Sequence, residues 1–153
     1  MKISKLVGPD NPKLKREVHY TDLKRAVATG NALVSYVKKV GALGLSANQA
    51  GIMERVCVVK MGPTFNIFID PHIIMRSEGT ISSREGSLSH PGLTGLVDRP
   101  QKLKLYWKEV EDWVIKEMTQ DFEGLNAISI EHMIDSLDGI RFIDKAKDIK
   151  EIE

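Results

Sequence analysis

Residues 131–136 are the first candidates for chemistry in this chain, because they have the outline of a zinc-hydrolase helix. In such a helix, two histidines four positions apart face one ion, and a glutamate lies beside the metal-bound water. Here His132 stands at the first histidine position. Met133 stands where the glutamate would be, and Ser136 where the second histidine would be. Taken alone, this pattern favours a structural histidine over a metal site.

Two further segments combine small residues with one polar side chain. Residues 44–51 place Gln49 in a run of Gly, Ala and Ser, where backbone can approach a ligand closely. Residues 85–92 place Ser87 among turn-forming residues. Each segment by itself is equally typical of a tight turn that satisfies its own backbone.

Taken together and in their order along the chain, the three segments resemble the motifs of the peptide deformylase family. Residues 42–49 are similar to Gly-x-Gly-Leu-Ala-Ala-x-Gln, with alanine at the first glycine and serine at an alanine. Residues 85–89 are similar to Glu-Gly-Cys-Leu-Ser, and residues 131–139 to Gln-His-Glu-x-Asp-His-Leu-x-Gly. The connecting segments around residues 10–18, 97–100 and 138–145 also resemble the corresponding segments of the family.

This resemblance implies an α+β fold, with mostly antiparallel strands around the third-motif helix. It also implies removal of the formyl group from the N-terminal methionine of new polypeptides. In the family a divalent metal, natively Fe²⁺, is held by the second-motif cysteine and the two third-motif histidines. The glutamate handles protons, while the glutamine and the N–H of the leucine after the cysteine stabilise the oxyanion.

The match at single positions is partial. Gln49 and Leu88 keep the oxyanion groups, Glu85 and Asp135 keep scaffold positions, and His132 keeps one ligand. The remaining ligands and the proton-transfer group are replaced by Ser87, Ser136 and Met133.

These replacements remove the means of catalysis. A serine hydroxyl stays protonated and replaces a soft thiolate poorly, and loss of the glutamate alone would cost about 10²–10⁴ in rate. The sequence therefore predicts no catalytic residue, no metal ligand and no cofactor. It predicts a vestigial pocket in which the two serines can hydrogen-bond the histidine and the methionine extends the apolar packing: Gln49, Glu85, Ser87, Leu88, His132, Met133, Asp135 and Ser136.

The leading hypothesis from the sequence is thus a catalytically inactive deformylase homologue. It would act as a binding or structural/assembly protein with protein partners, for which a component of a phage virion or tail is one candidate, and with residual peptide binding. One alternative is an active deformylase with a non-standard metal site made by His132 with Asp135 or Glu131. Another is a hydrolase that uses Ser87 and His132, with Gln49 and the Leu88 N–H as oxyanion donors.

Composition limits the remaining classes. The chain has 153 residues with a net charge of +1 and scattered basic residues, which gives no case for nucleic acid or an anionic membrane. No apolar run approaches the ~20 residues of a membrane span, and the start of the chain lacks a signal-peptide core. We therefore expect an intracellular, cytoplasmic protein, or one assembled into a virion. The single Cys57 lies in an apolar run and is expected to be an inert core thiol.

The elements that must position the motifs follow from periodicity. We expect a single domain over 1–153, with a helix over 21–41 that begins at Thr21 and ends at Gly41. Short runs over 55–61, 65–70, 72–75 and 102–107 predict strands, and a further run over 113–118 follows a polar break at 108–112. A last helix over about 125–138 ends at Gly139. The sum is an α+β fold.

Overall fold

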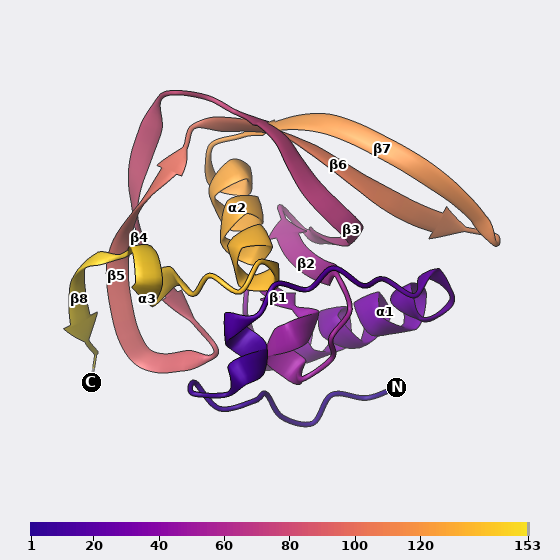
Figure 1. Cartoon of the computed structure of the whole chain (residues 1–153), viewed down its shortest axis with the longest axis horizontal. Coiled ribbons are helices and arrows are strands. Elements are labelled where there is room, and N and C mark those ends of the chain that lie inside the picture. The colour runs from indigo at the N-terminus through magenta and orange to yellow at the C-terminus, as the bar shows by residue number, and fades with distance from the viewer. Residues whose placement is uncertain (153) are drawn as a thin grey trace.

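Two antiparallel sheets with helix α2 between them form the body of the molecule in a computed structural model that describes residues 1–152 (Figure 1). The larger sheet has the order β1-β2-β3-β6-β7, and the smaller has the order β4-β5-β8. The strands are β1 (Gly44–Ser46), β2 (Val56–Met61), β3 (Thr64–Arg76), β4 (Thr80–Ser87), β5 (His90–Pro100), β6 (Lys102–Glu111), β7 (Val114–Glu123) and β8 (Lys147–Glu151). The helices are η1 (Pro12–Lys15), α1 (Leu23–Val40), η2 (Ala47–Ala50), α2 (Leu125–Leu137) and α3 (Phe142–Lys145). The predicted α+β class is confirmed.

Helix α1 packs its buried side chains, Ala26, Leu33 and Val37, against β2 and β3. Its N-cap is Asp22, whose carboxylate accepts the Lys24 N–H at 3.0 Å, so the prediction of Thr21 was wrong. The predicted end is confirmed: Gly41 has φ 74° and closes the helix from the left-handed region, which glycine adopts without steric cost.

Strand β3 runs through a break that the sequence suggested. We expected separate runs over 65–70 and 72–75 because Asp70 and Pro71 disfavour a strand interior. The structure keeps one strand, and the register with β6 shifts between Ile69 and His72 while Asp70 adopts φ 51°. A bulge therefore absorbs the proline, and the strand goes on to pair with β6.

The hairpin of β6 and β7 is longer than predicted. Its alternation is confirmed, because Leu103, Leu105 and Trp107 are buried. The predicted polar break over 108–112 was wrong for most of its length, since β6 continues to Glu111 and turns only at 112–113. Both turn residues have positive φ, which matches the twist of a tight hairpin.

Helix α2 carries the third motif through the centre of the core. The predicted stripe is confirmed, because Ala127, Ile130, Ile134 and Leu137 are all buried, against a cluster that contains Phe68, Trp107 and Phe122. After the helix ends, Gly139 has φ 77°, and a Cβ at this position would lie 2.7 Å from the carbonyl carbon of Arg16. The Val18 N–H donates to the Leu137 carbonyl at 2.7 Å, which ties the N-terminal segment to the end of α2. Among residues 1–152, no helix is both long and apolar enough to cross a membrane.

Candidate functional site

A cleft of about 420 Å³ lies where an edge strand of each sheet meets α2. From the larger sheet it is lined by residues 42–44 at and before β1, and from the smaller sheet by residues 83–88 of β4 and the turn that follows. Helix α2 supplies Leu125, Ile128, Ser129, His132 and Met133. The lining combines apolar side chains with the polar side chains of Gln49, Ser87 and His132.

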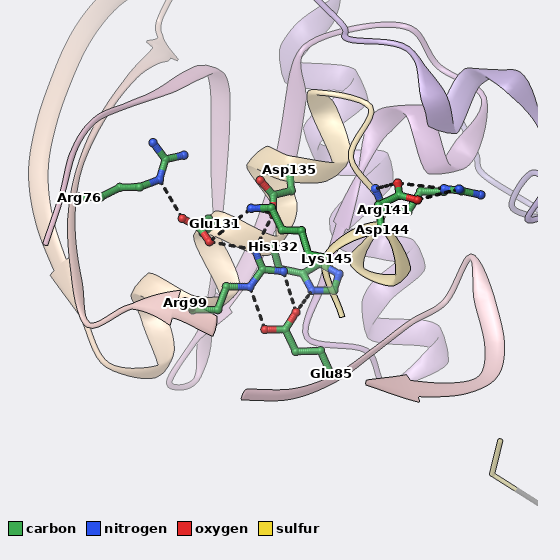
Figure 2. A network of polar contacts seen from close by, with 9 residues as sticks. All are labelled: Arg76, Glu85, Arg99, Glu131, His132, Asp135, Arg141, Asp144 and Lys145. Atoms are coloured by element: carbon green, nitrogen blue, oxygen red, sulfur yellow. Dashed lines mark hydrogen bonds and ion pairs between the residues drawn. The ribbon is translucent and has the colours of Figure 1, made fainter. Parts of the chain in front are cut away.

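A carboxylate fixes the orientation of His132 (Figure 2). The Glu85 Oε1 atom lies 2.8 Å from His132 Nδ1, and Glu85 also accepts bonds of 2.9 and 2.7 Å from Arg99. Burial acts to raise the pKa of Glu85, but the hydrogen bonds of His132 and Arg99 outweigh it and lower that pKa to about 2. An ionised carboxylate only accepts hydrogen bonds, so Nδ1 carries the proton that is shared with Glu85.

Arg99 is fully buried and joins three carboxylates. Its Nη1 lies 2.6 Å from Asp135 and 3.0 Å from Glu131. Glu131 is bonded in addition to Arg76 at 2.8 Å, and Asp135 to Lys145 at 2.8 Å (Figure 2). Both carboxylates are therefore occupied by cations, and the structure does not bring either of them to His132 as the second ligand that one alternative required.

Gln49 and Ser87 do meet, as the motif order implied. The Gln49 Nε2 donates to Ser87 Oγ at 3.3 Å and to Ser89 Oγ at 2.9 Å, while its Oε1 accepts the Ser46 N–H at 3.0 Å. Gln49 is thus held rigidly by the capping box that begins η2. Leu88 follows Ser87 in the turn and, like Gln49, lines the cleft.

The two serines do not bind His132, contrary to our expectation. Ser136 Oγ lies 2.7 Å from Ser46 Oγ and thereby holds the first-motif loop. Ser87 Oγ accepts from Gln49 and from the Ser89 N–H at 3.2 Å. Within residues 1–152, no hydrogen bond joins Ser87 to His132. The hydrogen-bond partner of His132 is Glu85 instead. A serine hydrolase needs an acid that orients its histidine, and Glu85 is such an acid for His132, although no such acid was evident from the sequence.

The family's metal does not fit the residues that replace its ligands. Ser136 is committed to the first-motif loop, and Ser87 offers a neutral hydroxyl where a thiolate would stand. Met133 is buried in the core beside Gly44 and carries no proton for transfer. Across the described part of the chain, no three His, Cys, Asp or Glu side chains surround a common point that could hold a metal.

Arg99 is the residue of the site that sequence reasoning missed. The sequence hinted at Arg99 only through the segment 97–100, which resembles the residues that follow the second motif in the family. Arg99 lies two residues after Val97, which is buried. Arginine is almost never fully buried without a partner, so a buried Arg99 requires an ion pair.

Comparisons with known proteins agree on one family. The polypeptide deformylase family matches residues 3–151 of the chain. A peptide deformylase of Natranaerobius thermophilus is 37% identical over 97% of this chain and 96% of its own length. A peptide deformylase of Thermoanaerobacter pseudethanolicus is 40% identical over 68% of this chain and 63% of its own length. The crystal structure of peptide deformylase from Thermotoga maritima superposes with a TM-score of 0.88 over 96% of this chain and 99% of that one, at 22% identity, and shows the same fold.

These relatives overturn our leading hypothesis from the sequence. Relatives at 37% and 40% identity are named as peptide deformylases, which are enzymes, and nothing in the comparisons indicates lost activity, a structural role or a virion component. The error came from treating three substituted positions as decisive for the whole chain. With its fold, its motif order and its match over nearly the entire length, the chain belongs to the peptide deformylase family.

Proposed function

We propose that this protein is a peptide deformylase that hydrolyses the formyl amide on the N-terminal methionine of new polypeptides in the cytoplasm. The observation that carries the proposal is the polar part of the cleft lining, in which Glu85 is bonded to His132 and Gln49 to Ser87. The family membership and the nearly full-length similarity to a named peptide deformylase support the same activity.

The shape and lining of the cleft suit a formyl-methionyl chain. Its apolar lining includes Leu43, Val59 and Ile128, which offer contacts for an unbranched thioether side chain. Strands β1 and β4 are sheet edges on either side, so their free backbone groups can pair with an extended peptide. Such pairing would hold the first residues of the substrate in one direction along the cleft.

The reaction adds water to the formyl carbon, breaks the carbon–nitrogen bond, releases formate and leaves a protonated amine. Gln49 and Leu88 both line the cleft, and we expect Gln49 Nε2 and the Leu88 N–H to donate hydrogen bonds to the oxyanion that develops on the formyl oxygen. Ser46 and Ser89 fix Gln49, and the second N–H of its Nε2, which donates to Ser87 at 3.3 Å, is the one that would turn to the oxyanion. Glu85 accepts the Nδ1–H of His132 and so fixes the orientation of that ring at the cleft.

The test is formate release from a formyl-methionyl tripeptide. We expect turnover by the native chain and a fall of about 10²–10³ in kcat for Gln49→Leu, as for other lost oxyanion donors. The matched control is Gln120→Leu, which makes the same chemical change on the exposed face of β7 and should leave kcat unchanged. Absence of formate release both with added divalent metal and with chelator would overturn the proposed function.

A further inference from the structure

Ser46 and Ser136 are two positions at which this chain departs from the family motifs, and they contact each other. Ser46 stands at an alanine of the first motif, and Ser136 at the second histidine of the third. Although 90 residues separate them in the sequence, their Oγ atoms lie 2.7 Å apart. An alanine at position 46 could not form this hydrogen bond, so the two serines act as a pair.

The Ser136 hydroxyl is the donor in this bond. Ser46 is fully buried, and its Oγ also lies 2.7 Å from Asn48 Oδ1 and 3.0 Å from Gln49 Oε1. Both of these are amide oxygens, which only accept hydrogen bonds, and a hydroxyl has a single proton to donate. The Ser46 proton is therefore directed to these oxygens, and a lone pair of Ser46 accepts the proton of Ser136.

This series of hydrogen bonds ends at the carboxamide of Gln49. Its Oε1 atom accepts from the N–H and from the hydroxyl of Ser46, each at 3.0 Å. Because the carboxamide is planar, holding its oxygen toward Ser46 turns Nε2 the other way, where it donates to Ser87 and Ser89. A carboxamide rotated by half a turn would present its NH₂ group to the Ser46 N–H, and the cleft would lose this donor.

We infer that Ser136 is a positioning residue for the oxyanion donor of the reaction. By donating to Ser46, it keeps the Ser46 hydroxyl directed at Gln49 Oε1, and the Gln49 Nε2 stays available to the formyl oxygen. Ser136 thus acts through two other residues. The inference rests on the proposed function, because an oxyanion donor has a role only in such a reaction.

The variant Ser136→Ala removes this hydroxyl and little else. Asn48 Nδ2 donates to the backbone carbonyl of Ser136 at 2.8 Å, and that bond does not depend on the side chain. Alanine is also the best helix former, so the variant should fold as the native chain does. The matched control is Ser35→Ala, which makes the same change at an exposed position of α1.

The first experiment measures formate release from a formyl-methionyl tripeptide. We expect Ser136→Ala to lower kcat by about tenfold, the equivalent of one hydrogen bond. KM should not change, because the oxyanion forms only in the transition state. Ser35→Ala should match the native chain. A change in kcat below about twofold, or an equal loss in the control, would overturn the inference.

The same substitution in a Gln49→Leu background separates positioning from a merely structural role. The donor is already absent in that background, so Ser136→Ala should lower kcat no further. A hydroxyl that only supported the fold would lower kcat by the same factor in both backgrounds. That second result would overturn the inference.

The second experiment observes the Gln49 carboxamide directly and needs no turnover. In the ¹H–¹⁵N NMR spectrum of the full chain, its NH₂ signals are those that disappear in Gln49→Leu. We expect their order parameter to be near that of rigid backbone in the native chain and in Ser35→Ala, about 0.85. In Ser136→Ala it should fall below about 0.6. An order parameter that Ser136→Ala leaves unchanged would refute the positioning role.

Failure of this inference can be told apart from failure of the proposed function. A carboxamide that loosens in Ser136→Ala, in a native chain that releases no formate, would uphold the positioning and overturn the deformylase activity. Formate release that Ser136→Ala leaves unchanged would uphold the activity and overturn the positioning.

Discussion

Substitution of Glu85 by glutamine would test the ion pair that orients His132. The Glu85 carboxylate is 8% exposed and accepts two hydrogen bonds from Arg99 and one from His132. Glutamine keeps the size of the side chain and removes its charge. The variant therefore isolates what the ionised carboxylate contributes to the folded state.

The magnitude follows from the pKa of Glu85, which falls from 4.5 to about 2 on folding. A fall of that size corresponds to about 3 kcal/mol of stability, because the folded state favours the ionised form. Since the pKa is depressed, this stability is fully present above pH 4.5 and is lost as the pH falls toward 2. Glu85→Gln lacks it at every pH.

The measurement is urea denaturation of the native chain and the variant at pH 7, 5, 4 and 3. We expect a difference of about 3 kcal/mol in the free energy of unfolding at pH 7, which shrinks steadily below pH 4.5 because the unfolded chain takes up a proton at Glu85 while the folded chain does not. The control is Glu123→Gln, an exposed carboxylate 3.6 Å from Lys102, which should change stability by less than about 0.5 kcal/mol. A difference that stays constant with pH, or one below about 1 kcal/mol at pH 7, would refute the assignment of the buried charge to Glu85.

Three further measurements address other parts of the molecule. Arg99→Met should lower the free energy of unfolding by about 3–5 kcal/mol at pH 7, because it leaves three buried carboxylates without their shared cation; a loss below about 1 kcal/mol in urea denaturation would contradict the network. A fluorophosphonate probe, read by mass spectrometry, should not label Ser87, because no hydrogen bond joins it to His132 in the described chain; labelling there would instead favour the serine-hydrolase alternative. Burial raises the pKa of Cys57 to about 12, with a smaller opposing effect of Arg55, so iodoacetamide at pH 8 should alkylate this thiol only after unfolding in urea; equal rates in the native state would show that the thiol is accessible.

The parts of the fold that could be predicted are those with regular periodicity. Helix α2 and strand β6 were located correctly because their buried side chains recur at the spacing of a helix and of a strand. Where prediction failed, tertiary contacts overrode local preference. Pro71 stays inside β3 because a bulge absorbs it, and Lys108 stays in β6 because the strand pairs with β7 on one edge and β3 on the other.

The candidate site was predictable in its members and not in their pairing. The motifs brought Gln49, Ser87 and His132 to one cleft, as their order implied. The hydrogen-bond partner of His132 could not be predicted from sequence spacing. Glu85 lies on β4 whereas His132 lies on α2, and Glu85 is itself held by Arg99.

The close approach of Gly139 to the backbone at residues 15–16 constrains the order in which the chain can fold during synthesis. That contact, with the Val18–Leu137 hydrogen bond, joins a segment synthesised early to one synthesised late. Closing so large a loop is entropically expensive and is repaid only when both segments are available. A growing chain on the ribosome therefore cannot seat the helix that bears His132 until that helix has emerged, so the cleft cannot form before residues 125–139 have been synthesised.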